Sequence, residues 1–190
     1  MRVVALPELQ ETSDLPCDTG SDVSVLEAEF GAGGVVDLGL VGEGWNGKVG
    51  RWSPAASAIE ARAREARVWL RDLAREAHTQ GGDGNGDGDK DVDIVVVTHG
   101  GFLHYFTEDW EGNEKFTGTG WANTEVRSYE FVDAGMGDEA ASLVETRESR
   151  RARRGSERGL SGDEQRQLRA SAEREWAQSG FQGGAESAKL

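Results

Sequence analysis

The sequence predicts an α/β fold in which helices flank a mostly parallel sheet. Residues 54–78 have the periodicity of a long amphipathic helix. Residues 93–98, Asp-Ile-Val-Val-Val-Thr, form a β-branched run that is typical of a strand buried on both faces. The Gly-rich stretch His99-Gly100-Gly101 then leads into a second, short helix. Helix, buried strand and helix in this order are typical of α/β proteins.

The elements that precede the long helix are short. Residues 2–6, Arg-Val-Val-Ala-Leu, predict a buried strand that ends at a proline. Residues 22–30 predict a helix whose Val25 and Leu26 face inward. Residues 31–50 are rich in glycine, so we expect them to be irregular.

The long helix has the strongest pattern in the chain. Ser53 and Pro54 form a helix start, because a capping residue is followed by a first-turn proline. Apolar residues then recur at intervals of four and three, which places them on one stripe and leaves arginines to cover the opposite face. The stripe consists of Ile59, Ala63, Ala66, Leu70, Leu73 and Ala77, and Trp69 broadens it.

Residues 81–89, Gly-Gly-Asp-Gly-Asn-Gly-Asp-Gly-Asp, match the opening of an EF-hand calcium loop. The match then fails, because Lys90 stands where an apolar residue belongs and Ile94 stands where a bidentate glutamate is needed. The chain also continues as a strand rather than as a helix. We therefore expect a flexible acidic linker, with calcium binding as the alternative, and we expect no metal ion or other cofactor.

The last third of the chain changes in character. Residues 124–132 alternate polar and apolar side chains, which predicts a strand, and residues 141–144 can pair with it. Residues 147–154 contain a basic tract of five arginines, for which a solvated tail helix or linker is favoured over a nuclear-targeting or nucleic-acid-binding patch. The polar remainder has helical potential at residues 161–177, and we expect it to be poorly ordered.

The composition of the chain argues against nucleic-acid and membrane partners. A net charge of -14 repels polyanions, so we expect no nucleic-acid partner. The longest aliphatic run, residues 94–97, is far too short to span a bilayer, so we expect no membrane partner. The single cysteine, Cys17, cannot form an internal disulfide, which fits a reducing compartment. We therefore expect a cytoplasmic protein, with the nucleus as the alternative location.

Asp18-Thr19-Gly20-Ser21 is the tetrapeptide found in the active sites of aspartic proteases. Such a protease uses two carboxylates that share one proton, and this chain holds one copy of the motif, so it would have to act as a dimer. The lead-in contains Pro16, which cannot donate to the ladder of a central strand. We interpret the tetrapeptide as a coincidence and keep a dimeric aspartic protease that uses Asp18 as a minor alternative.

Two other stretches indicate a different chemistry. Residues 3–11, VVALPELQE, place Glu11 after an early strand, and residues 95–105, VVVTHGGFLHY, place His99 at the end of the buried strand. A strand followed by Leu-Gln-Glu, and about ninety residues later a strand followed by Thr-His-Gly-Gly, resembles the histidine phosphatase superfamily. The wider set of motifs resembles the fungal phosphoglycerate mutase-like proteins over residues 3 to about 154; it adds residues 9–22, 44–52 and 118–131 to the stretch around His99.

The resemblance implies an incomplete three-layer sandwich of the phosphoglycerate mutase type. It implies phosphoryl transfer or phosphomonoester hydrolysis through a phosphohistidine, with a small phosphorylated molecule as the partner. Glu11 would be the general acid and base. His99, together with the backbone amides of Gly100 and Gly101, would bind the phosphoryl group. His104 is five residues further on, the wrong spacing for two metal ligands on one helical face, and we expect it to be structural.

One part of the family's pattern is missing from the sequence. Relatives begin with a strand that ends in Arg-His-Gly and supplies the nucleophile, and this sequence contains no Arg-His pair. We therefore expect a truncated or inactive form that does not form a phosphohistidine. The alternative is a non-catalytic interaction protein derived from the same fold. On this interpretation residues 1–146 are the C-terminal portion of a histidine phosphatase domain, and residues 147–190 are an Arg-rich, weakly helical or disordered tail.

Overall fold

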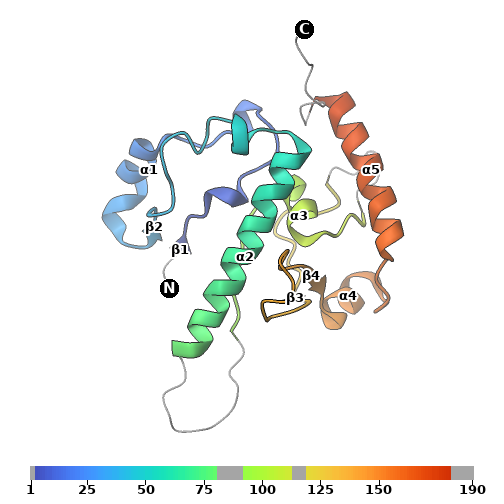
Figure 1. Ribbon diagram of the computed structural model, residues 1–190. Coiled ribbons are helices and arrows are strands. Elements are labelled where there is room, and N and C mark those ends of the chain that lie inside the picture. Colours follow the sequence, from blue (N-terminus) through green and yellow to red (C-terminus); the bar gives the residue numbers. More distant parts are fainter. Residues whose placement is uncertain (1–2, 81–91, 113–118, 181–190) are drawn as a thin grey trace.

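The computed structural model describes residues 3–80, 92–112 and 119–180 (Figure 1). In the view of Figure 1, the long helix α2 crosses the middle of the molecule, with α1, β1 and β2 on one side and α3, α4 and α5 on the other. The helices are α1 (Val23–Phe30), α2 (Ala56–Gln80), α3 (Gly100–Thr107), α4 (Arg147–Arg154) and α5 (Gly162–Ser179), with 3₁₀ turns at Pro7–Leu9, Pro16–Asp18, Gly31–Gly33 and Gly50–Trp52. The strands are β1 (Val3–Val4), β2 (Val36–Asp37), β3 (Tyr129–Phe131) and β4 (Leu143–Glu145).

The predicted α/β fold, an incomplete three-layer sandwich with a mostly parallel sheet, is wrong. Helices account for 49% of the described residues and strands for 6%. The strands form two separate two-stranded sheets: β1 pairs with β2 in parallel, and β3 pairs with β4 in antiparallel orientation. The expected pairing of residues 124–132 with residues 141–144 is confirmed at Glu130, which lies opposite Val144.

The central error concerns residues 93–98, which are extended but belong to no ladder. Their backbone groups form no backbone hydrogen bond with any other described residue. Ile94 and Val96 pack against the core, whereas Val95 and Val97 are 83% and 86% exposed. A strand buried on both faces needs a neighbour along its edges and a layer above and below it. In the described part of the chain, this segment is covered on one face.

The predicted long helix is confirmed as α2, which runs from Ala56 to Gln80. The part of its apolar stripe from Ile59 to Leu70 lies in the buried cluster with α3, whereas Ala77 is exposed; the cluster also takes in one residue of α5. Burying a large apolar side chain contributes about 1.5–3 kcal/mol, so this cluster is the main source of stability. The buried members are Ile59, Ala63, Ala66, Leu70, Phe102, Tyr105, Phe106, Trp110 and Ala172.

Three arginines of α2 do not face solvent, and for them the prediction of a polar outer face is wrong. Arg62, Arg67 and Arg71 are each at most 3% exposed. Arg67 Nη1 donates to the carbonyl oxygen of Tyr105 at 3.0 Å, and Arg71 Nη1 donates to the carbonyl oxygen of Asp138. A guanidinium has five donors, so it can satisfy loop carbonyls that no ladder pairs. These arginines tie the loops of the molecule to α2.

The predicted helix at residues 22–30 is present as α1, which begins one residue later and follows Asp22. Leu26 is half-buried, but half of Val25 is exposed, so the prediction that Val25 faces inward is wrong. The acidic linker expected at residues 81–89, with its calcium alternative, lies outside the described residues. Among the described helices, none combines the length and the apolar character that a bilayer-spanning segment requires.

The arginine tract forms α4, which packs one of its faces against the body of the protein. Arg150 is buried, and its Nη2 lies 2.9 Å from Glu111 Oε2. Arg153 Nη2 donates to Glu145 Oε2 at 2.7 Å, whereas Arg151 is exposed. The buried Arg150 and the half-buried Arg153 of α4 thus each have a carboxylate partner, as charges removed from water require.

The helical potential at residues 161–177 is realised as α5. The helix begins with a capping box in which Ser161 accepts from the Glu164 amide and the Glu164 side chain accepts from the Ser161 amide. Ala172 of α5 is buried in the core, and the Trp176 ring lies 5.8 Å from the Trp110 ring. The Trp176 ring also lies 5.9 Å from the ring of His104 in α3, so aromatic contacts hold α5 against the helix that carries the candidate site.

Candidate functional site

The start of α3 brings together residues that are about ninety positions apart in the sequence. Glu11 Oε1 accepts a hydrogen bond from the Phe102 amide at 3.0 Å, and Oε2 accepts one from the Gly101 amide at 3.3 Å. Oε1 also accepts one from the Thr12 amide at 2.8 Å. The first amides of a helix have no partner within the helix, and the helix dipole favours a negative charge there. Glu11 therefore occupies the anion-accepting end of α3.

Close approach requires glycine at the first two positions of α3. A Cβ on Gly101 would lie 2.8 Å from Glu11 Oε1, and a Cβ on Gly100 would lie 2.2 Å from Thr119 Oγ1. Both separations are shorter than Cβ contacts in proteins allow. The two glycines therefore let a carboxylate and a hydroxyl reach the helix terminus.

His99 is the N-cap residue of α3, and its carbonyl oxygen accepts from the Leu103 amide at 3.0 Å. Its imidazole is exposed and forms no hydrogen bond or ion pair with another described residue. The Gly100 amide likewise has no hydrogen-bond partner among them. The structure thus places Glu11 on the amides of Gly101 and Phe102. His99 and Gly100, which directly precede these residues in the sequence, keep an imidazole and an amide without a partner among the described residues.

Two buried cations, which the sequence analysis did not single out, hold the loop that carries Glu11. Arg62 Nη1 donates to the carbonyl oxygens of Glu8 at 2.7 Å and Gln10 at 2.6 Å, and Nη2 donates to that of Glu11 at 3.0 Å. Lys48 Nζ donates to the same Glu11 carbonyl at 2.9 Å. The backbone of Glu11 is therefore fixed from two sides, while its carboxylate is fixed by α3.

The electrostatics of these cations follow from their burial. Burial lowers the pKa of Arg62 to about 10, and the charges of Glu11 and Glu8 oppose the shift. Burial also lowers the pKa of Lys48, and the neighbouring Arg62 lowers it further. Lys48 has a φ of 50°, in the left-handed region that residues other than glycine rarely adopt. With a pKa of about 10, Arg62 remains cationic at neutral pH, so it offsets part of the negative charge of Glu8 and Glu11.

Thr98, the residue before His99, fixes the same loop from the other side. Thr98 Oγ1 donates to the carbonyl oxygen of Leu9 at 2.6 Å, and Gln10 Nε2 donates to that of Trp45 at 2.8 Å. The Glu11 loop and the end of the extended segment are therefore joined directly. This contact sets the position of the Glu11 carboxylate relative to His99.

The Asp-Thr-Gly-Ser tetrapeptide forms a turn rather than the end of a strand. Asp18 ends the 3₁₀ turn Pro16–Asp18 and accepts a hydrogen bond from the buried hydroxyl of Ser13. Thr19 Oγ1 donates to the carbonyl oxygen of Leu15 at 3.0 Å. These bonds close the loop that follows Glu11, so they give Asp18 a structural part and do not support the protease alternative.

His104 lies in the interior. Its Nδ1 is 2.6 Å from the carbonyl oxygen of Asp109, its Nε2 is 2.5 Å from that of Thr119, and its ring stacks on Trp110 at 5.2 Å. Burial lowers the pKa of His104, against the effect of the two carbonyls. Its burial and its two carbonyl contacts are those of a structural residue. Within the described residues, no group of three or more His, Cys, Asp or Glu side chains could hold a metal ion.

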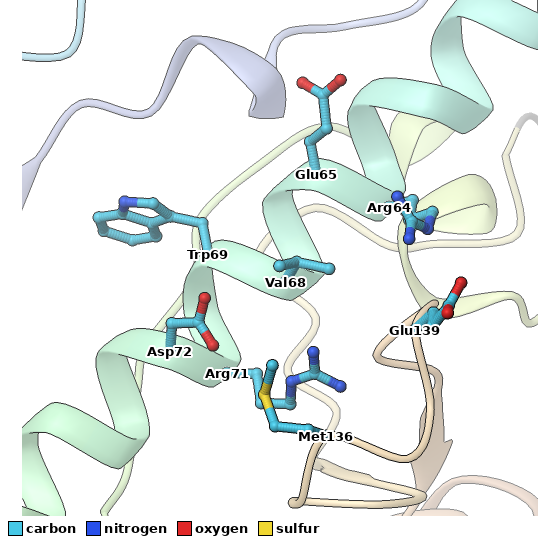
Figure 2. A pocket seen from close by; sticks show the side chains of 8 residues that line it. All are labelled: Arg64, Glu65, Val68, Trp69, Arg71, Asp72, Met136 and Glu139. Atoms are coloured by element: carbon cyan, nitrogen blue, oxygen red, sulfur yellow. The ribbon is translucent and has the colours of Figure 1, made fainter.

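An open hollow of about 450 Å³ lies elsewhere, between α2 and the loop that carries Met136 and Glu139 (Figure 2). It contains none of the four predicted site residues. Its positive and negative side chains are mixed, and they include Arg64, Glu65, Arg71, Asp72 and Glu139 beside Val68, Trp69 and Met136. No single sign of charge therefore selects a ligand there, and the start of α3 remains the better candidate site.

Comparisons with known proteins provide no further assignment. The sequence matches no protein-family model, and it matches neither a curated protein nor a solved structure.

Proposed function

We propose that this chain binds phosphomonoesters through the acid/base half of a histidine phosphatase-type site. His99 and the amide of Gly100 are the groups that receive the phosphoryl oxygens. Glu11 is the group that would give a proton to the leaving oxygen and take one from water if a nucleophile were supplied. The observation that carries this proposal is the contact of the Glu11 carboxylate with the amides of Gly101 and Phe102, the two residues that follow His99 and Gly100 in the sequence.

The charges around the helix terminus support the same proposal. Phosphoryl transfer depends on positioning and on stabilising negative charge, so its site needs donors and cations. Arg62 and Lys48 supply two positive charges at the backbone of Glu11, in a protein whose net charge is -14. The carboxylates of Glu8, Glu11, Asp14 and Asp18 act on the same two cations, so these cations offset the negative charge around Glu11.

The proposal assigns no nucleophile to this sequence. The three histidines are His78, His99 and His104, and none follows an arginine. His104 is buried against two carbonyl oxygens, and His99 is assigned to the phosphoryl oxygens rather than to attack. We therefore expect binding of a phosphate ester without turnover.

Titration with inorganic phosphate, followed by ¹H–¹⁵N NMR, tests the binding. We expect saturable shifts in the amides of residues 99–103. Glu11→Gln removes a like charge next to the anion, so it should tighten binding by about tenfold, equivalent to about 1.4 kcal/mol. His99→Asn should weaken binding by about tenfold, and His78→Asn, an exposed histidine near the end of α2, is the matched control that should change nothing.

Turnover is measured separately, with p-nitrophenyl phosphate and with mass spectrometry of the intact chain. We expect no release of p-nitrophenol and no added phosphoryl group. Phosphate that shifts no amide between residues 99 and 103 would exclude the proposed site. Release of p-nitrophenol that His99→Asn abolishes, or a phosphoryl adduct on His99, would show that the assignment of roles is wrong.

A non-catalytic interaction protein is the second candidate. The observation that favours it is the exposure of Val95 and Val97 on an extended segment, because exposed apolar surface on an unpaired edge marks an association site. Under this candidate alone, phosphate leaves the amides at the start of α3 unchanged. The NMR titration therefore separates the two functions.

A further inference from the structure

Residues 93–99 present an unpaired strand edge with a regular exposed face. The backbone groups of residues 93–98 bond to no other described backbone group, although the segment is extended. Residues 94–98 contain neither a charged side chain nor a proline, the devices that usually protect an edge from pairing. Side chains alternate along it: Asp93, Val95, Val97 and His99 are exposed, and Ile94, Val96 and Thr98 are half-buried.

The exposed face is complementary to itself in one register. If two copies pair antiparallel with Val96 on the twofold axis, Asp93 of each copy lies opposite His99 of the other. In the same register, Val95 of each copy lies opposite Val97 of the other. Oppositely charged or hydrogen-bonding pairs then flank two valine pairs, and cross-strand pairs of both kinds stabilise antiparallel sheets.

Other registers lose this match. A slip of one residue turns the exposed face of one copy toward the core face of the other. A slip of two residues in one direction sets Asp93 opposite Val97, and in the other direction it sets His99 opposite Val95. A parallel pair in register places Asp93 beside its own copy, and like charges repel. The sequence of this short segment therefore selects one antiparallel arrangement.

We propose that the chain forms a homodimer through antiparallel pairing of residues 93–99 about Val96. The occupant of the edge is a second copy of the chain, because the segment supplies its own charge-complementary partner. The twofold contact uses the same edge of both copies, so this contact closes on itself and yields a dimer. The pairing of the strands does not require phosphate binding, although both proposals use the side chain of His99.

Sedimentation velocity over a range of concentrations tests the dimer. The mass of the wild-type chain should rise from 20.5 kDa toward twice that value. Val95→Lys combined with Val97→Lys places lysines opposite lysines and should raise the dissociation constant by at least about tenfold. Val95→Lys combined with Val97→Glu removes the same two valines but places each lysine opposite a glutamate of the second copy, so it should retain the dimer.

Three controls separate loss of the dimer contact from misfolding of the variants. Both altered side chains are more than 80% exposed, so circular dichroism should show an unchanged monomer fold. Val126→Lys, an equally exposed valine outside the segment, should leave association unchanged. Should the double lysine variant fail to fold, Asp93→Lys applies the same charge test at the edge of the segment and should also weaken the dimer.

A wild-type chain that stays monomeric at every concentration overturns the proposal. Equal association of the lysine–lysine and lysine–glutamate variants also overturns it, because the register then has no effect. Loss of association in Val126→Lys alone would place the interface elsewhere on the molecule.

Discussion

Replacing Arg62 with alanine is expected to lower the free energy of unfolding by about 3–5 kcal/mol. Arg62 is 1% exposed, and its guanidinium bonds three backbone carbonyls of the loop that carries Glu11. It also lies 4.6 Å from the ring centre of Phe102 in the core. The substitution therefore removes the link between α2, the Glu11 loop and α3 in one step.

The magnitude follows from the hydrogen bonds and from the cost of burying the cation. A hydrogen bond from a charged donor contributes about 1.5–3 kcal/mol, so the three bonds of Arg62 contribute roughly 4.5–9 kcal/mol. Burial lowers the pKa of Arg62 to about 10, which corresponds to a cost of about 3 kcal/mol for holding the charge. The difference is a few kcal/mol, and alanine also leaves three carbonyls unpaired beside a void.

Urea unfolding followed by far-ultraviolet circular dichroism measures the effect. Arg64→Ala is the matched control, because Arg64 lies two positions along α2 and is exposed, so its loss should change the stability by no more than about 0.5 kcal/mol. Hydrogen exchange gives a second readout: the amides of Gly101 and Phe102 should exchange faster in Arg62→Ala than global destabilisation alone explains. A stability within about 1 kcal/mol of Arg64→Ala would refute the reasoning.

Two other changes test the packing at α3. Gly101→Ala should lower the melting temperature, because the new Cβ displaces the Glu11 carboxylate; each kcal/mol of unfolding free energy lost lowers it by about 2–4 °C. Gly162→Ala at the start of α5 is the control and should not lower it. An unchanged melting temperature in Gly101→Ala would contradict the contact between Gly101 and Glu11. Burial lowers the pKa of His104 below its ordinary value of about 6.5. Neutral His104 therefore contributes to the free energy of unfolding above pH 6.5, and this contribution is lost as the pH falls below that value. The urea midpoint should therefore fall between pH 7.5 and pH 5.5, and less so in His104→Gln; a rise would mean that the protonated ring donates to both carbonyls.

The long helix could be predicted because its signal is local. Apolar residues at intervals of three and four fix the face of α2 without reference to any other element. The same spacing places Arg62 on the apolar stripe, because it lies three residues after Ile59 and four before Ala66. A charged residue on that face has to find partners in the interior, and here the partners are the carbonyls beside Glu11.

The sheet could not be predicted correctly, because strand pairing depends on residues far apart in the chain rather than on a local pattern. A β-branched run such as residues 94–97 shows a preference for extended backbone, which the structure has, but a ladder also needs a neighbouring strand. That neighbour is a property of the rest of the chain. Among the described residues no backbone group pairs with residues 94–97, and β1 pairs with β2 over two residues. The prediction of an extended segment is therefore confirmed, and the prediction of a buried one is wrong.

At the candidate site, too, local motifs indicate which residues to consider, whereas their contacts depend on residues far apart in the sequence. The choice of Glu11 and His99 rested on a family resemblance, and the contact between the Glu11 carboxylate and the α3 amides could not be read from either motif alone. It depends on Thr98, Arg62 and Lys48, which lie in three different parts of the sequence and bond only to backbone atoms of the Glu11 loop. Side-chain bonds to backbone leave no complementary residue pattern, so periodicity and motif analysis cannot detect them.

The two proposals meet at His99, and this gives them a common physical consequence. In the proposed dimer, the imidazole lies opposite Asp93 of the second copy; in the proposed phosphate site, the same imidazole receives phosphoryl oxygens. One ring cannot serve both partners fully, so each partner lowers the affinity for the other by the same factor. In the dimer, the carboxylate of Asp93 from the second copy would lie near the start of α3. Its negative charge would then compete with phosphate for the proposed phosphate site. The acidic residue that selects the register would then also oppose phosphate binding, and the monomer would be the form that accepts the phosphate ester.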